Sequence, residues 1–118
     1  MSVPLRWCRL STRDRMADIS LASIRGPRPL VLDLEKAVDI LKEQGCEEIY
    51  VFGSLATGRA TEKSDIDIGI KHYPTERFFR IYGRLIMGID HHFDLVDFEL
   101  NAQMFAVLSE IREVQRIT

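Results

Sequence analysis

A run of alternating residues in the middle of the chain limits the fold more strongly than any other sequence feature. Residues 65–70 read Asp-Ile-Asp-Ile-Gly-Ile, so polar and apolar side chains alternate with a period of two. This period is typical of a β-strand, in which residues i and i+2 point to the same face. Asp65 and Asp67 are therefore expected to project together. Ile66 and Ile68 are expected to point to the opposite side, toward a core.

Hydrophobic spacing elsewhere in the chain predicts helices and further strands around this one. Helices are expected over residues 31–44, 74–87 and 101–113, and residues 55–60 are expected to form a short helical turn or a loop. Strands are expected over residues 48–52, 93–98 and 114–117. Helices that alternate with short strands in this order predict an α/β (α+β) domain, in which helices flank a small mixed β-sheet.

The length of 118 residues fits one compact domain preceded by a basic segment. Residues 1–28 carry six Arg and two Asp and are interpreted as a basic N-terminal arm. Three interpretations stay open for it: a short helix over residues 13–24, a disordered arm, or a segment that is not native, with Met16 as an alternative start. Residues 29–118 form the predicted domain and carry ten basic and sixteen acidic residues. Because general nucleic-acid binders need a basic face, direct nucleic-acid binding is not expected.

The cysteines and the hydropathy of the chain indicate its cellular compartment. Cys8 and Cys46 are isolated and form no CxxC motif, which favours reduced thiols in a cytoplasmic protein. No apolar run approaches the roughly 18–20 residues that a membrane helix needs. We therefore expect a cytoplasmic protein with no membrane partner, and the sequence leaves open whether it forms a homo-oligomer.

The paired carboxylates of Asp65 and Asp67 require an explanation, because two such groups close together repel each other and raise each other's pKa. A cation between them relieves this repulsion. Mg²⁺ prefers oxygen ligands, usually one or two carboxylates together with phosphate oxygens and water. The pair therefore predicts a magnesium site, and the alternative for the pair taken alone is an exposed edge strand with solvated acids.

A Gly53-Ser54 pair lies ten residues before Asp65 and directly follows the expected strand over 48–52. Gly53 lets the backbone approach a ligand closely, and the N–H groups that begin a helical turn suit a phosphate. The Ser54 hydroxyl can donate a hydrogen bond to a phosphate oxygen. A phosphate-binding turn beside a metal site is what phosphoryl or nucleotidyl transfer requires, because that chemistry depends on positioning and charge neutralisation.

A third carboxylate is expected on the next strand, and three residues are candidates. Asp94, at the start of that strand, is preferred; Asp97 points to the other face of the strand, and Asp90 lies in a loop. The expected role of the third carboxylate is to bind the metal nearest the attacking group and to accept the proton of the nucleophile.

These motifs together resemble a known superfamily. Gly53-Ser54, ten residues, then Asp65-Ile66-Asp67, followed by Phe93-Asp94-Leu95-Val96, is similar to the nucleotidyltransferase superfamily of the DNA polymerase β type. The small size resembles the minimal nucleotidyltransferases (MNT), which are often the antitoxins of HEPN/MNT toxin–antitoxin systems. The resemblance covers roughly residues 31–117 and includes the nucleotidyltransferase fold.

The resemblance implies an activity and a role for each motif residue. Members bind ATP with Mg²⁺, here expected as two ions, and the antitoxins transfer AMP to a tyrosine of a partner HEPN toxin RNase. Ser54 matches the phosphate-binding serine, Asp65 and Asp67 match the metal-binding pair, and Asp94 matches the third carboxylate. Members often carry Arg where this chain has Ala56 and Thr57, so the positive charge of this loop would come from Arg59 and Lys63.

Two other functions remain as alternatives. The loop with Ala56 and Thr57 and the net negative charge of residues 29–118 also suit an antitoxin that neutralises its toxin by binding alone, without catalysis. A small-molecule modifier of the aminoglycoside nucleotidyltransferase kind is the third possibility, although 118 residues leave little room for the added domain that builds an acceptor site there.

Other conspicuous side chains are interpreted as structural or solvated. The adjacent His91 and His92 are interpreted as loop residues. Aromatic side chains are expected in the core: Tyr50, Phe52, Phe78, Phe79, Phe93 and Phe98. Charged helical faces are expected in solvent, with a partner contact as the alternative: Asp33, Glu35, Asp39 and Glu43 on the first helix, and Arg77, Arg80 and Arg84 on the third.

Overall fold

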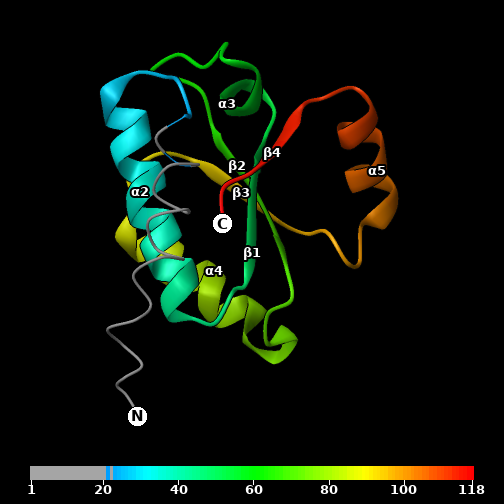
Figure 1. Ribbon diagram of the computed structural model, residues 1–118. Helices are drawn as coiled ribbons and strands as arrows, with labels where there is room; N and C mark the ends of the chain where they lie inside the picture. The colour runs from blue at the N-terminus through cyan, green and yellow to red at the C-terminus, as the bar shows by residue number, and fades with distance from the viewer. Residues whose placement is uncertain (1–20, 22) are drawn as a thin grey trace, which may run out of the picture.

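The computed structural model describes residues 21 and 23–118, and in that range helices surround a four-stranded sheet (Figure 1). The helices are α2 (Arg28–Glu43), α3 (Ser54–Thr57), the 3₁₀ turn η1 (Thr75–Arg77), α4 (Phe78–Gly88) and α5 (Ala102–Glu110). The strands are β1 (Glu48–Phe52), β2 (Ile66–Lys71), β3 (Phe93–Asp97) and β4 (Val114–Arg116). The predicted α+β class with a small mixed sheet is confirmed.

The sheet has the order β3-β2-β1-β4, and its strand directions are mixed. β1 runs antiparallel to both β2 and β4, whereas β2 and β3 are parallel. Phe52, the last residue of β1, pairs with Asp67 of β2, and Asp67 pairs with Asp94 of β3. The register therefore places Asp67 between the end of β1 and Asp94.

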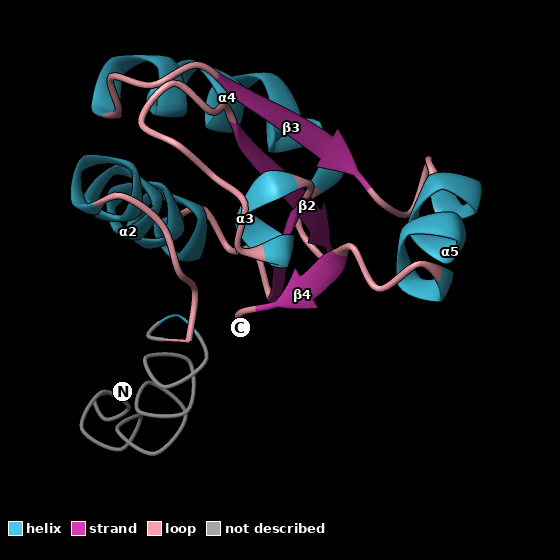
Figure 2. Cartoon of the chain, turned by 90° about the horizontal axis from the view of Figure 1, so that it is seen from above, coloured by secondary structure: helices cyan, strands magenta, loops and turns pink. Residues whose placement is uncertain are grey.

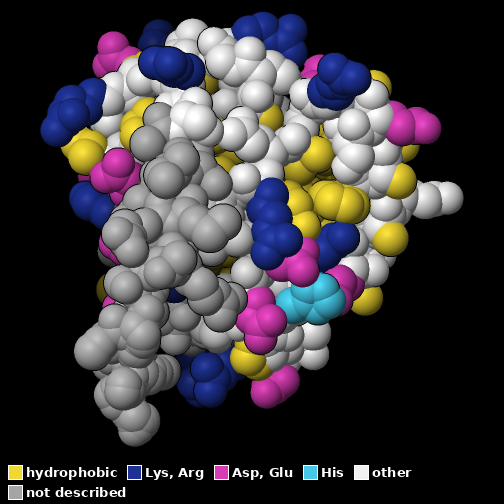
Figure 3. All heavy atoms as spheres, in the orientation of Figure 1, with side chains coloured by type: hydrophobic (Ala, Val, Ile, Leu, Met, Phe, Trp, Pro, Cys, Tyr) yellow, Lys and Arg dark blue, Asp and Glu magenta, His cyan; other side chains and the backbone are white. Residues whose placement is uncertain are grey.

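The two faces of the sheet are covered differently. Figure 2 shows α2 and α4 on one side and α5 on the other. The side of α2 and α4 holds the main core, where Leu34, Ile68 and Leu85 are fully buried. On the other side, Tyr50, Phe52 and Phe98 form a smaller aromatic cluster with side chains of α5. In Figure 3, hydrophobic side-chain atoms are visible at the surface between the positions of β1 and α5.

Helix α2 follows from the spacing of its apolar residues. Leu30, Leu34 and Leu41 recur at helical intervals and are completely buried. Pro29 occupies the first turn, where its missing N–H leaves no backbone partner unsatisfied. The chain leaves the helix through Gly45, whose φ of +92° suits only glycine at low cost.

The third predicted helix differs from the observed one. Residues 75–77 form a 3₁₀ turn, and α4 begins at Phe78. Only Ile81 and Leu85 are buried in α4, so its core-facing stripe is narrower than the pattern indicated. The expectation that Phe79 belongs to the core is wrong, because it lies one position off this stripe and is 86% exposed. Tyr50, Phe52 and Phe98 are buried as expected.

Several expectations concern residues outside the described range. These are most of the N-terminal arm over residues 1–28, the alternative start at Met16, and Cys8. Within the described range, Ile24 is buried in the main core, and Cys46 is a buried free thiol whose pKa burial raises to about 11. Over residues 21 and 23–118, no helix is both long and apolar enough to cross a membrane.

Candidate active site

The Gly53-Ser54 turn joins the end of β1 to the short helix α3. Gly53 has φ +72° and ψ −141°, a combination that residues with a Cβ atom rarely adopt. Its N–H donates to the Glu113 carbonyl at 3.1 Å, and its own carbonyl accepts from the N–H groups of Ala56 and Thr57. The turn is thus held from both sides, and the Ser54 hydroxyl has no partner among the described residues.

Asp67 lies directly against this turn. A Cβ atom placed on Gly53 would come within 2.5 Å of Asp67 Oδ2, so the carboxylate occupies the space that a larger side chain would need. The contact follows from the sheet, because Asp67 pairs with Phe52, the residue before Gly53. The expected meeting of the Gly-Ser turn and the acidic strand is therefore present.

Asp94 lies beside Asp67 on the neighbouring parallel strand. Paired residues of adjacent strands point to the same face of a sheet, so the two carboxylates share a face. Asp65 is exposed and lies just before β2, two residues before Asp67, close enough for its charge to act on Asp67. Burial first, and then the charges of Asp94 and Asp65, raise the pKa of Asp67 to about 6. The three carboxylates thus repel one another in the absence of a cation.

The other two candidates for the third carboxylate lie elsewhere. Asp97 is 5% exposed, accepts a hydrogen bond from the Tyr73 hydroxyl, and also accepts from the backbone N–H groups of Glu99 and Leu100. Asp97 lies three residues after Asp94 in β3, so it points to the opposite face of the strand. Its hydrogen bonds give it a structural role. Asp90 is exposed in the loop before β3. Geometry therefore places Asp94, and neither alternative, next to Asp67.

The donor set fits a magnesium ion, although the side chains do not already converge around one point. Over residues 21 and 23–118, no group of three or more His, Cys, Asp or Glu side chains is arranged as a ready metal site. The fit rests on chemistry: Asp67 and Asp94 are carboxylate donors held in register, and burial together with the negative charges of Asp94 and Asp65 raises the pKa of Asp67. Hard oxygen ligands of this kind suit Mg²⁺, which completes its shell with water and phosphate oxygens.

The side chain of Arg59, the one arginine in the loop after α3, is engaged with neighbouring side chains. Arg59 donates through Nε to Thr57 Oγ1 at 3.1 Å and approaches Glu113 at 3.5 Å. Lys63 is exposed in the same loop. Arg59 is therefore paired with a carboxylate, whereas Lys63 has no carboxylate within ion-pair distance among the described residues.

Asp33 contradicts the expectation of a solvated helix face. It is 4% exposed, and its Oδ2 accepts from the N–H groups of Asp90 and His91 at 3.0 Å each. The same oxygen lies 2.6 Å from His91 Nδ1. Burial opposes the charge of Asp33, but these hydrogen bonds outweigh it and lower the pKa of the carboxyl. His91 is thus a loop residue with a fixed partner.

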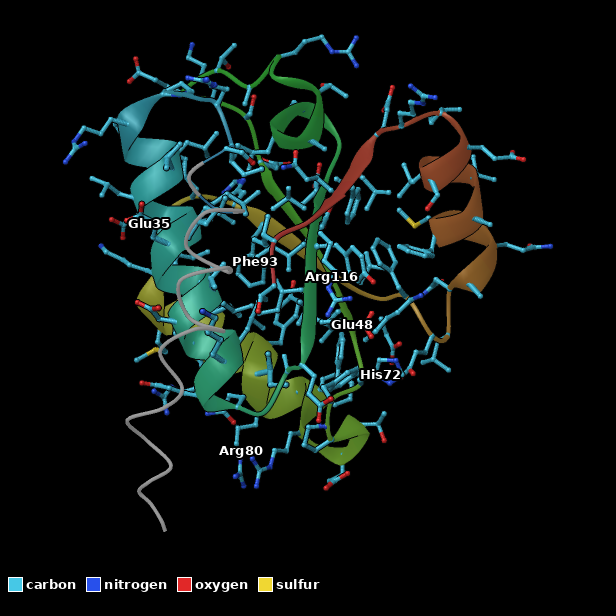
Figure 4. All side chains as sticks on the ribbon, viewed as in Figure 1. Glu35, Glu48, His72, Arg80, Phe93 and Arg116 are labelled. Carbon is cyan, nitrogen blue, oxygen red and sulfur yellow. The ribbon has the colours of Figure 1, made fainter. Side chains whose placement is uncertain are left out.

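The helical spacing of the sequence indicates that Asp33 is buried, although its charge favours solvent. Asp33 lies three residues after Leu30 and four before Ala37, both of them fully buried, so it occupies the apolar face of α2. The remaining charged positions behave as expected. Glu35 and Arg80 are exposed and point away from the sheet in Figure 4, and Arg84 reaches Glu43 at 3.5 Å across the outer surface.

A separate charged cluster lies at the far end of β1. His72 Nε2 is 3.1 Å from Glu48, which also accepts from the Tyr50 hydroxyl at 2.6 Å and lies 4.0 Å from Arg116. Figure 4 shows Glu48, His72 and Arg116 grouped together there. The same strand ends at Phe52, the residue before Gly53, so His72 lies at the opposite end of β1 and takes no part in the candidate site.

Comparisons with known proteins agree with this geometry. A family model described as "Polymerase beta, Nucleotidyltransferase" matches residues 35–116, which include the Gly53-Ser54 turn and all three carboxylates. Neither the curated proteins nor the solved structures gave a match. The matched segment covers more than half of the chain and contains the whole sheet. The chain belongs to the polymerase β-type nucleotidyltransferase family.

Proposed function

We propose that this protein is a minimal nucleotidyltransferase that transfers AMP from ATP to a hydroxyl group of a partner protein. The partner we propose is a HEPN toxin RNase, modified on a tyrosine in the cytoplasm, so that the chain acts as an antitoxin. The observation that carries the proposal is the register of the sheet, which brings Asp67 and Asp94 side by side and places the Gly53 turn against Asp67.

Each residue of the site has a task in this reaction. Ser54 and the backbone of its turn would hold the phosphates, and Asp65, Asp67 and Asp94 would hold Mg²⁺. Bound there, Mg²⁺ supplies positive charge to the phosphate oxygens. The acceptor oxygen forms a bond to the α-phosphorus while the bond from that phosphorus to the bridging oxygen breaks. Pyrophosphate leaves, and the proton of the acceptor hydroxyl passes to the Asp94 carboxylate.

A protein acceptor is favoured over a small molecule by the position of the site. The site opens on the surface of the described domain, with Asp65 and Asp94 both exposed. Such a site can reach a side chain on the surface of another protein.

The test uses ATP labelled in its α-phosphate, Mg²⁺ and the product of the adjacent gene as acceptor. The wild-type chain should label the acceptor, and the Asp65→Asn/Asp67→Asn variant should not. Asp39→Asn is the matched control, because Asp39 is an exposed acid on α2 that takes no part in the site. Equal labelling by the double variant would exclude these carboxylates from catalysis, and no labelling by the wild type would exclude the transfer.

The second candidate is an antitoxin that acts by binding alone. The observation that favours it is Arg59, which is engaged with Thr57 and Glu113 in a loop that has Ala56 and Thr57 where relatives often carry Arg. If Asp65→Asn/Asp67→Asn still protects cells from the toxin and still binds it, this second function is supported. Loss of protection together with retained binding supports catalysis.

A further inference from the structure

A pocket adjoins the candidate site on the side of α4. It has a volume of about 460 Å³, and Asp65 and Asp94 form part of its wall. Tyr82, Ile86 and Phe93 supply apolar surface, and His91 lies in the same wall. Gly53 and Ser54 do not line it. The pocket therefore extends from the carboxylates in a direction away from the phosphate-binding turn.

The lining indicates which reactant this pocket accepts. Asp65, Asp90 and Asp94 place three carboxylates around it, and among the residues that line it there is no Lys or Arg. Negative charge of that density repels a triphosphate but tolerates a neutral hydroxyl compound. Apolar and aromatic walls with a few polar groups are typical of a site for an aromatic side chain.

His91 is held in one orientation in this wall. Asp33 is buried beneath it and contacts its Nδ1 at 2.6 Å, while the same carboxylate oxygen also accepts from the His91 backbone N–H. An ionised carboxylate can only accept hydrogen bonds, so Nδ1 carries a hydrogen. In the neutral ring, Nε2 then has a lone pair, and it has no hydrogen-bond partner among the described residues.

We propose that this pocket is the acceptor subsite, and that His91, oriented by Asp33, binds the acceptor hydroxyl through Nε2 beside Asp94. The inference rests on the proposed function, because it assigns the acceptor of that same reaction. His91 binds the substrate in this scheme, and Asp33 is a positioning residue that acts through His91. His92, which also lines the pocket, has no carboxylate partner among the described residues and serves as the internal comparison.

The first test separates acceptor binding from nucleotide binding. In His91→Asn, the amide can still donate to Asp33, so the loop keeps its anchor, but nothing replaces Nε2. The KM for the protein acceptor should rise about tenfold, as expected for one lost hydrogen bond, and the KM for ATP should stay within about twofold. His92→Asn should change neither value. Equal effects of the two variants on the acceptor KM would overturn the inference while leaving the transfer itself established.

The second test needs no transfer activity, so it decides the inference even if the wild type labels no acceptor. Two small probes are titrated by NMR, N-acetyltyrosinamide and N-acetylphenylalaninamide, which differ by the phenolic hydroxyl alone. The tyrosine probe should bind the wild type about tenfold more tightly and shift the ring signals of His91. In His91→Asn the two probes should bind equally. Absence of binding, or an unchanged preference in the variant, overturns the inference.

The role of Asp33 is tested by the tautomer of His91. In the wild type, ¹⁵N shifts of the ring should show a protonated Nδ1 and an unprotonated Nε2. Asp33→Asn supplies an amide that can donate as well as accept, so the second tautomer should become populated, whereas Asp39→Asn on the same helix should leave the ring unchanged. An unaltered tautomer in Asp33→Asn would remove the positioning role.

Discussion

Asp67 Oδ2 lies where a side chain on Gly53 would have to go, since a Cβ at that glycine would be 2.5 Å from the oxygen. Two segments that are distant in sequence therefore meet because one of them has no side chain. The same glycine has φ +72°, which allows β1 to turn into α3 directly beneath the carboxylate. Turn geometry and carboxylate placement are thus coupled at one position.

Gly53→Ala should destabilise the protein and remove transfer activity. The new Cβ clashes with Asp67, and the backbone conformation is strained for alanine, so we expect about 3 kcal/mol lower stability. Displacement of the carboxylate should lower the transfer rate about 100-fold even at temperatures where the variant is folded. Gly58→Ala is the matched control, because Gly58 has φ +77° but nothing lies within 4 Å of the position that a Cβ would take there; it should cost about 1 kcal/mol and spare activity.

The charge of Asp67 should destabilise the metal-free protein at neutral pH. Its pKa is raised from 3.8 to about 6 in the folded state, so the folded protein binds the proton more tightly than the unfolded chain does. This contribution to stability is present at low pH and is lost as the pH rises from about 4 to about 6. Asp67→Asn should therefore be more stable than the wild type by about 1 kcal/mol at pH 7 in EDTA, after allowance for solvent screening.

Urea unfolding between pH 4 and pH 8 measures this effect. The wild type should lose stability over that interval relative to Asp67→Asn, and the two curves should approach each other at the acidic end. Asp65→Asn, at an exposed position beside it, should show a smaller gain. A variant less stable than the wild type at pH 7 would contradict the repulsion argued for the three carboxylates.

Magnesium should reverse the order of stabilities. A ligand that binds only the folded state adds about 1.4 kcal/mol at a concentration ten times its Kd. Adding Mg²⁺ should therefore raise the melting temperature of the wild type and of Asp39→Asn, and it should leave Asp67→Asn unchanged. Calorimetry with and without Mg²⁺ provides the measurement, and an equal increase in Asp67→Asn would place the ion elsewhere.

Two aspartates of β3 should respond to substitution in opposite ways. Asp94→Ala should remove transfer and leave stability almost unchanged, because Asp94 is exposed and its carboxylate repels Asp67. Asp97→Ala leaves the Tyr73 hydroxyl and two backbone N–H groups without their acceptor, which should cost about 3 kcal/mol. Folded Asp97→Ala should retain transfer. Parallel measurements of unfolding and labelling test the pair, and the reverse pattern would make Asp97 the catalytic residue.

The sequence predicted the acidic strand because its signal is local. The alternation over residues 65–70 determines which side chains share a face, whatever lies around them. The choice between Asp94 and Asp97 is different in kind. They lie on opposite faces of β3, and only the register of β3 against β2 decides which one meets Asp67. That register depends on the packing of the whole sheet. The sequence could therefore favour Asp94 over Asp97, but it could not show which of the two lies next to Asp67.

The Asp33–His91 pair could not be found from either residue alone. Helical spacing places Asp33 on the buried face of α2, but an acid in that position is normally expected in solvent. Its burial is possible because the loop before β3 supplies two backbone donors and a histidine ring. Those donors are 57 and 58 residues away in sequence, so only the fold reveals them.

Gly69 should be as intolerant of a side chain as Gly53, for a reason that lies in packing. It follows Asp67 on the same face of β2, and the ring of Phe98 lies over it so closely that a Cβ would come within 2.0–2.4 Å of three ring carbons. Phe98 is fully buried and contacts Phe52 and Phe105, so it has no free space to move into. Gly69→Ala should therefore destabilise the protein by about 3 kcal/mol through overpacking.

Gly83→Ala in α4 is the control, because nothing lies within 4 Å of the added methyl group and alanine favours the helix by up to about 1 kcal/mol. Unfolding of both variants by urea gives the comparison, and a Gly69→Ala protein as stable as the wild type would show that the aromatic cluster under α5 can repack.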